Sequence, residues 1–394
     1  MMMLAKLPGL LVLCIAFGVG SVNSLAQAQT PATDRVPLNA DGKVAQAGDN
    51  SAPATGPLND LPPEPEPKLQ LLLPLPGDEG IGNLGADGPM GGRSPFGNPL
   101  VGQAPIRGDY RATWFAAEPV AGQPTNMGYF RQELSVSSPV WQKSGQDEWS
   151  VFASVRDEIF QTHAILPDTR QAFPEDLWNI RFGTSYRYLF DNGWILGGTL
   201  SVGSASDRPF NGLEELTAGV NTFLRVPSGE NNAWLFSLSY SPTGQLPYPI
   251  PTVAYVWQPS DTFHMNIGLP FILMWRPTEE VTLDVTYMLL TTLHARVSYR
   301  LSDQARLYLA YASESEAYLL ADRVDNNDRF YNVDQRAFAG SQYFFTKKCS
   351  LDFSGGYLFD RFFFEGKNIS TDSNFNRVDL GAGPYASAQF QLRW

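Results

Sequence analysis

The sequence predicts an all-β fold, a transmembrane antiparallel up-and-down β-barrel of about 16 strands, from three observations. Apolar and polar side chains alternate along many segments, which is the period of a strand with one apolar and one wet face. No segment after the N-terminus approaches the ~18 uninterrupted apolar residues of a membrane helix. An aromatic residue, a turn-forming gap and a new strand also recur at a fixed spacing of six residues. These units run from Tyr188 to Trp194, Trp257 to Phe263, Trp275 to Val281, Tyr299 to Ala305 and Tyr343 to Cys349.

Residues 1–28 have the features of a secretory signal peptide. Lys6 precedes an apolar run over 7–19 that is too short to span a bilayer, and residues 26–28 read Ala-Gln-Ala, which a signal peptidase accepts. Cleavage there leaves one cysteine, Cys349, and a single thiol forms no internal disulfide. We therefore expect a secreted protein whose fold does not depend on disulfides.

Residues 29–108 form one block that is rich in Pro, Gly, Asp and Ala and almost free of aromatic residues. Such a segment buries too little apolar surface to offset its ordering entropy, so we expect a disordered periplasmic linker. A short apolar stretch at 69–75 could dock on a partner or inside the barrel. The barrel domain itself is expected at residues 109–394.

The alternation is clear in residues 177–190. Trp178, Ile180 and Phe182 share one face, whereas Arg181 and other polar or small residues share the opposite face. A tight turn is expected at 268–271, which separates the least clearly bounded pair of strands, and a barrel of 12–14 strands is the alternative count. The predicted strands are 109–118, 128–141, 148–160, 177–190, 194–204, 213–226, 232–241, 249–258, 262–269, 271–276, 281–289, 292–301, 305–314, 328–345, 349–363 and 378–394.

The expected connections alternate in length, with short turns on one rim and longer, more polar loops on the other. Outer-membrane barrels have this asymmetry, and their short turns face the periplasm. Both chain termini are then periplasmic. Aromatic rings prefer the headgroup level of a bilayer, and many lie beside the short-turn rim. The predicted interfacial girdle consists of Tyr188, Trp194, Trp234, Trp257, Trp275, Tyr299, Tyr343 and Trp394.

Charged residues that alternate with the apolar face are expected to line the lumen, since an arginine facing lipid at the midplane would cost about 2–4 kcal/mol. In an open barrel these guanidiniums would favour anions. In a closed barrel, Arg–carboxylate pairs would fill the interior, and the sequence leaves both arrangements open because cross-lumen pairing depends on the register. The candidates for setting selectivity are Arg181, Arg187, Arg225, Arg296, Arg300 and Asp284.

Nothing in the sequence predicts catalysis, a cofactor or a metal site. The three histidines, His163, His264 and His294, belong to no nucleophile–base pair and no cluster with metal-ligand spacing. The acidic stretch at 322–334 lacks the glycine and terminal glutamate of a calcium-binding loop. A formal net charge of −12 argues against nucleic acid as a partner.

The chain ends in an amphipathic strand whose last residue is Trp394. Ala388, Phe390 and Leu392 share its face. This end resembles the assembly signal of outer-membrane barrel proteins, although the terminal residue there is usually Phe. The resemblance implies that the barrel-assembly machinery is a partner.

The segment 109–394 resembles the outer-membrane β-barrel proteins of Gram-negative-type bacteria. Within them it is most similar to an uncharacterised family known only as a domain of unknown function, through Trp-Arg-Pro at 275–277 and Tyr-Arg-Leu at 299–301. The resemblance implies a location in the outer membrane, in contact with its lipid, and supplies no activity.

These observations favour a passive pore for small hydrophilic solutes. The alternative is a non-conducting structural or interaction barrel, plugged by side chains or by residues 29–108. An outer-membrane hydrolase is the least favoured reading, because the sequence lacks a nucleophile–base pair.

Overall fold

The computed structural model describes residues 104–143, 145–369 and 375–394. The predicted signal peptide and all but the end of the predicted linker lie outside these residues. None of the helices in the described part is long and apolar enough to cross a membrane. The one helical element there is a 3-10 turn, η1 (Leu213–Glu215).

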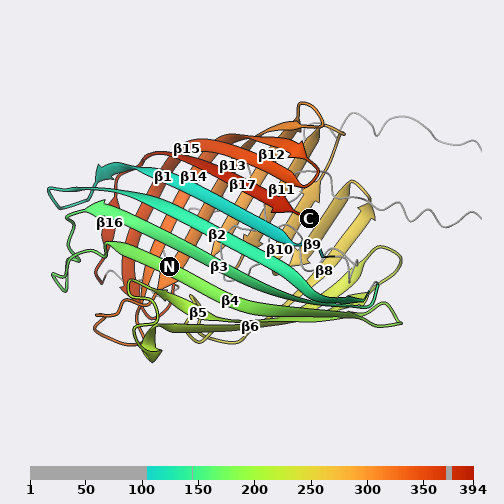
Figure 1. Cartoon of the computed structure of the whole chain (residues 1–394), viewed down its shortest axis with the longest axis horizontal. Coiled ribbons are helices and arrows are strands. Elements are labelled where there is room, and N and C mark those ends of the chain that lie inside the picture. Colours follow the sequence, from blue (N-terminus) through green and yellow to red (C-terminus); the bar gives the residue numbers. More distant parts are fainter. Residues whose placement is uncertain (1–103, 144, 370–374) are drawn as a thin grey trace, which may run out of the picture. The chain divides into compact units, whose positions relative to one another are not determined.

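The described residues fold into one antiparallel sheet that closes on itself (Figure 1). Each strand from β1 to β15 pairs with its sequence neighbour, β17 pairs with β15, and β1 also pairs with β17, which closes the barrel. The strands are β1 (Arg107–Pro119), β2 (Asn126–Lys143), β3 (Asp147–Thr162), β4 (Asp176–Leu189), β5 (Ile195–Ser206), β6 (Leu216–Pro227), β7 (Ala233–Tyr240), β8 (Ile250–Ser260), β9 (Phe263–Gly268), β10 (Phe271–Trp275), β11 (Val281–Met288), β12 (Thr292–Arg300), β13 (Ala305–Tyr318), β14 (Arg329–Thr346), β15 (Cys349–Gly366), β16 (Val378–Leu380) and β17 (Gly383–Arg393).

The last two strands share one position in the wall. Both β16 and β17 pair with β15, and residues 381–382 interrupt what the sequence predicts as one strand. The described barrel therefore has sixteen strand positions, which confirms the predicted fold class and count. The predicted strand 213–226 begins later, at Leu216, because residues 213–215 form the 3-10 turn. The tight turn at 268–271 is present between β9 and β10.

The two faces of the wall differ as the alternation predicts. Leu309, Phe353 and Trp114 project outward from β13, β15 and β1 and are 54–68 % exposed. Their strand neighbours project into the lumen and are buried or half-buried. Because the exposed face is apolar on strand after strand, this is the exterior of a membrane-spanning barrel rather than the surface of a soluble one.

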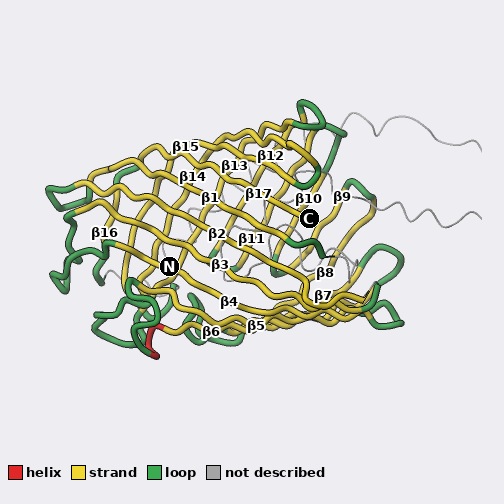
Figure 2. The backbone as a smooth tube through the Cα atoms, viewed as in Figure 1, coloured by secondary structure: helices red, strands yellow, loops and turns green. Residues whose placement is uncertain are grey.

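The wall is uneven in height. β2, β14 and β15 have 18 residues each, whereas β9 has six and β10 has five. Figure 2 shows the long strands running most of the length of the barrel, with the short strands near one end. A tilted strand needs about 9–11 residues to span a bilayer. The strands β9 and β10 therefore cover only part of the apolar thickness.

The connection 241–249 reaches past these short strands. It joins β7 to β8, yet its Gln245 amide donates to the Ser315 carbonyl on β13, and the Ser315 hydroxyl returns a bond of 2.8 Å to Gln245 Oε1. Arg329 on β14 donates to the carbonyl oxygen of Pro242 at 2.6 Å. The strands β9–β12 lie between these partners in the sheet order, so this connection bridges the low part of the wall.

Both ends of the barrel domain lie at the rim with the short turns. Arg107 pairs with Arg393, and the backbone of Ile106 exchanges hydrogen bonds of 2.9 and 3.1 Å with Trp394. The longer connections, such as 163–175 and 319–328, gather at the opposite rim. The two rims are called the short-turn end and the long-loop end below.

Candidate functional site in the barrel lumen

An ion-pair network crosses the lumen near the long-loop end. Arg131 on β2 lies 2.7 Å from Glu158 on β3 and 3.7 Å from Glu316 on β13. Arg156 on β3 pairs with Glu316 as well, and its Nε lies 2.8 Å from Glu133 Oε1. Strands β14, β15, β17 and β1 stand between β13 and β2 in the sheet. The contacts to Glu316 therefore join opposite walls.

Neutral side chains also form hydrogen bonds with the buried carboxylates of Glu158 and Glu316. The Tyr318 hydroxyl lies 2.7 Å from Glu316 Oε2 and 3.1 Å from Glu158 Oε1. Asn332 on β14 donates to the other oxygen of Glu158 at 3.2 Å. Glu158 is fully buried, and a buried carboxylate is tolerated where cations and donors surround it in this way.

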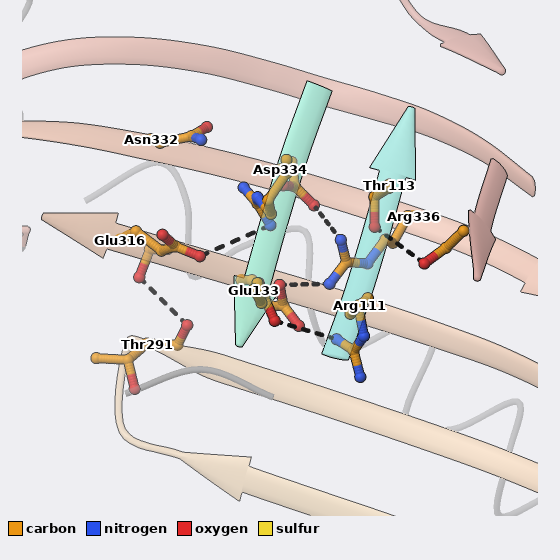
Figure 3. A network of polar contacts seen from close by, with 12 residues as sticks. Arg111, Thr113, Glu133, Thr291, Glu316, Asn332, Asp334 and Arg336 are labelled. Atoms are coloured by element: carbon orange, nitrogen blue, oxygen red, sulfur yellow. Dashed lines mark hydrogen bonds and ion pairs between the residues drawn. The ribbon is translucent and has the colours of Figure 1, made fainter. Parts of the chain in front are cut away.

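The network continues along β1 and β14. Arg336 on β14 pairs with Glu314 on β13 and lies 3.9 Å from Asp334. Arg111 on β1 lies 3.8 Å from Glu133. Figure 3 shows these side chains converging from several strands, with Glu316 on one side of the group and Arg111 on the other. We call the set the crossing network: Arg111, Arg131, Glu133, Arg156, Glu158, Glu314, Glu316, Tyr318, Asn332, Asp334 and Arg336.

An aromatic layer adjoins the crossing network at the long-loop end. Phe173, from the connection between β3 and β4, packs with ring centroids 5.1 Å from Phe160 and 5.0 Å from Phe363. Phe330 stacks on Phe363 at 5.5 Å. All four rings are buried. The connection 163–175 therefore turns inward and seals this mouth with apolar side chains.

The inner wall at the short-turn end has a different composition. The strands β5–β8 contribute a buried apolar patch there, although barrel lumens are ordinarily polar. Beside this patch lie Arg225 on β6 and His264 and Asn266 on β9. The members of the patch are Ile195, Phe223, Ala233, Leu235, Ala254 and Val256.

The six charged residues predicted for the lumen alternate with the exposed apolar face, as expected. Asp284 and Arg296 are buried and face each other in register on β11 and β12. Arg187 donates to both oxygens of Glu148 at 2.9 and 2.8 Å. Asp284 and Arg296 are thus the two predicted candidates that the register places opposite each other.

The other three candidates differ from one another. Arg300 lies at the short-turn rim, 3.8 Å from the exposed Glu279. Arg181 is half-buried and does have an interaction partner. Arg225 makes no hydrogen bond or ion pair with the described residues, and its Nε is buried without a partner.

The predicted girdle residues all flank the short turns. Tyr188 and Trp275 are half-buried. The other six are exposed on the outer face: Trp194, Trp234, Trp257, Tyr299, Tyr343 and Trp394.

Sequence reasoning missed Glu316 and Tyr318, the part of the crossing network that β13 contributes from the opposite wall. The predicted strand 305–314 stops before Glu316 and Tyr318, so they fall in a predicted loop. The signal was present, because Glu314, Glu316 and Tyr318 continue the period of two set by inward-facing Tyr308 earlier in the strand.

Asp360 corrects the expected register. A period of two along 349–363 would place Asp360 on the lumen face together with Asp352, but Asp360 is exposed. A bulge between Phe359 and Phe362, where Asp360 has a φ of 50°, advances the pattern by one residue. Arg361 is turned inward as a result and lies over the Tyr129 ring at 5.5 Å.

The acidic residues between 322 and 334 do not form one site. Asp334 lies in β14, whereas Asp325 and Asp328 are in the loop before it. The Asn327 backbone N–H and Lys367 lower the pKa of Asp325, while burial and the charge of Asp325 raise the pKa of Asp328. The described residues contain no group of His, Cys, Asp and Glu side chains that could hold a metal ion.

Several solved structures resemble this chain. An outer membrane channel from Pseudomonas putida F1 is 10 % identical with a TM-score of 0.36, over 77 % of this chain and 99 % of that one. Outer membrane protein Omp33 of Acinetobacter baumannii is 6 % identical with a TM-score of 0.32, over 74 % and 99 %. Pseudomonas aeruginosa OccK7 is 9 % identical with a TM-score of 0.32, over 74 % and 98 %. No curated protein matches the chain.

The barrel architecture described above is that of the outer-membrane β-barrel fold. A family model matches residues 166–393, which is more than half of the chain and includes β4 to β17. The chain therefore belongs to the family described as domain of unknown function DUF6268.

Proposed function

We propose that this protein is an integral barrel of the bacterial outer membrane that forms a pore for small hydrophilic solutes and is held closed at its long-loop end. The observation that carries this proposal is the pairing of Glu316 on β13 with Arg131 and Arg156 from the opposite wall. A passive pore that stays open would not have charged side chains bonded across its lumen.

A half-buried polar wall along the middle of β4, β5 and β6 supports conduction once the closed end opens. Arg181, Thr199 and Asn221 retain partial exposure on lumen-facing positions of β4, β5 and β6. Such a lining favours hydrated solutes over apolar ones. A structural barrel that never conducts is the alternative function, and the filled long-loop end supports it equally.

Recording from the full chain in planar bilayers separates these functions. The wild type should give only small, infrequent openings. A triple variant, Arg131→Ala with Arg156→Ala and Glu316→Ala, removes both partners of each cross-lumen pair, and combined with Phe173→Ala it should conduct severalfold more. Arg300→Ala, at the exposed rim pair, is the control for a charge change and should behave as the wild type.

Three results are informative. A large steady wild-type conductance would show an open pore and contradict the closed state. If neither protein conducts while both keep the gel-mobility shift of a folded barrel between unheated and boiled samples, the structural barrel is correct. A rise confined to the combined variant supports the proposal.

The placement in the membrane belongs to the same proposal. The aromatic residues at the short-turn end would form the periplasmic girdle, with both termini periplasmic, and the C-terminal strand ending at Trp394 would engage the barrel-assembly machinery. In a Cys349→Ser background, a membrane-impermeant maleimide should label a cysteine at Leu213 in intact cells but not one at Gly145. The reverse labelling would invert the orientation.

A further inference from the structure

Three polar side chains on the inner wall of the short-turn end have buried atoms without hydrogen-bond partners. Asn266 on β9 is fully buried, and neither its Nδ2 nor its Oδ1 has a hydrogen-bond partner. On the same strand, His264 Nε2 is also buried without a partner. Arg225 on β6 makes no hydrogen bond or ion pair with the described residues. Buried polar groups are ordinarily bonded, so unpaired ones call for an explanation such as a bound molecule.

These groups face one another around the apolar patch. Arg225 pairs in register with Ile195 and Leu235, and Asn266 pairs with Val256. The Asn266 side chain and the positive charge of Arg225 both act on the His264 imidazole, so the three side chains lie close together. Strands β7 and β8 lie between β6 and β9 and contribute Ala233 and Ala254, whose short side chains leave the lumen free for longer groups from either side.

The charge balance of this region is positive. The lumen-facing acid nearest in the sheet is Asp284, two strands away on β11, and it stands opposite Arg296. Glu148, another lumen-facing acid of this half, is bound by Arg187. Apolar surroundings lower the local dielectric, which strengthens the attraction between a guanidinium and an anion. Arginine also suits oxyanions because its planar fork can donate two parallel hydrogen bonds.

We propose that Arg225, His264 and Asn266 form a binding site for an oxyanion, either the carboxylate of an organic acid or a phosphate. The Arg225 guanidinium supplies the charge, and the Asn266 amide and the His264 imidazole each supply a neutral N–H donor. The inference rests on the proposed pore function and names its solute class: small anions rather than neutral or cationic solutes.

Calorimetric titration of the full chain, refolded in a non-ionic detergent, tests the site without requiring conduction. Inorganic phosphate and benzoate are the anionic probes, and benzamide is the neutral match for benzoate. We expect heat from at least one anion and none from benzamide. Phosphate alone would indicate a phosphate site, benzoate alone an organic-acid site, and both a general oxyanion site. Equal binding of benzamide, or no binding of either anion, would overturn the proposal.

Matched variants locate the binding. Arg225→Gln should weaken anion affinity about tenfold or more, because a charge-assisted hydrogen bond is lost. Arg208→Gln makes the same charge change at an exposed ion pair with Asp322, in the loops at the opposite end, and should bind as the wild type. Asn266→Asp places a negative charge in the site and should also weaken anion binding. This second variant keeps the site testable if Arg225→Gln does not fold. Unchanged affinity in either site variant, in protein that keeps the gel-mobility shift, would contradict this assignment.

The titration and the bilayer recording can fail separately. If the protein binds anions but does not conduct, the barrel is structural. This result refutes the proposed pore but not the proposed binding site. Conductance in the opened variant without anion binding refutes the site but not the pore.

Discussion

Arg225 at the short-turn end of this lumen differs from the arginines at the long-loop end. There, Arg131, Arg156 and Arg336 each lie within 4.0 Å of two carboxylates. At the short-turn end, Arg187 is bound to Glu148, whereas Arg225 has no carboxylate partner among the described residues. Lumen arginines therefore cross-link the wall where acids face them, and Arg225 is the one to which we assign a ligand.

The difference follows from strand length and sequence. β13 continues to Tyr318 and so carries Glu314 and Glu316 inward at the long-loop end. The strands β6–β8 end at the short-turn rim with apolar or small residues facing the lumen. An arginine there has no acid within reach in the register of its neighbours. Residue type alone does not determine the role of a lumen arginine; the acids on nearby and opposite strands do.

The largest expected effect tests whether the long-loop end is a packed core. Phe173→Ala removes a buried ring that contacts Phe160, Phe330 and Phe363, and we expect a loss of about 3–5 kcal/mol in the free energy of unfolding. Denaturant unfolding followed by tryptophan fluorescence measures it. Leu213→Ala, in an exposed loop position, should change the same quantity by less than about 0.5 kcal/mol. Similar small values for both would mean that the loop does not seal the mouth.

A smaller loss is expected from breaking the crossing network on one side. Glu316→Ala leaves two buried guanidiniums with one carboxylate fewer. We expect the free energy of unfolding to fall by about 3 kcal/mol, because Arg131 keeps Glu158 and Arg156 keeps Glu133. The control, Glu279→Ala, removes the exposed partner of Arg300 and should cost no more than about 1 kcal/mol. If both cost the same, the crossing network would be no more than a surface contact.

Much of the wall was predictable from the sequence, because a period of two fixes which side chains share a face. The sixteen strand positions, the turn at 268–271 and the shared face of Arg181, Arg187 and Arg225 all follow from it. The pairing of the charges did not follow, since Glu316 meets Arg156 only once the barrel closes. The bulge at Asp360 was also beyond reach, because alternation assumes an unbroken register.

The signal in the sequence for the short-turn site was weaker still. His264 and Asn266 look like ordinary lumen-lining residues, and their lack of partners appears only when the surrounding side chains are placed. The apolar patch was hidden as well, since Phe223, Leu235 and Val256 lie on strands whose opposite face is also apolar. The lumen face of a strand is identified in a sequence when it is polar and the opposite face is apolar. The strands of the apolar patch lack this difference between their two faces.

The smallest expected effect compares one amide at each end. Asn266→Leu replaces a buried amide without partners by an apolar side chain of similar size, so in anion-free buffer it should raise the free energy of unfolding by about 1–2 kcal/mol. Asn332→Leu removes the amide that donates to Glu158 and should lower the free energy of unfolding by a similar amount, because it leaves a buried carboxylate with one donor fewer. The measurement is the same denaturant titration.

Added phosphate or benzoate should stabilise the wild type but not Asn266→Leu, since only a ligand bound to the folded state raises stability. A loss of stability in Asn266→Leu without anion would mean that its amide has a structural role. The two ends of the lumen would then differ in charge pairing, but the amide at each end would be structural.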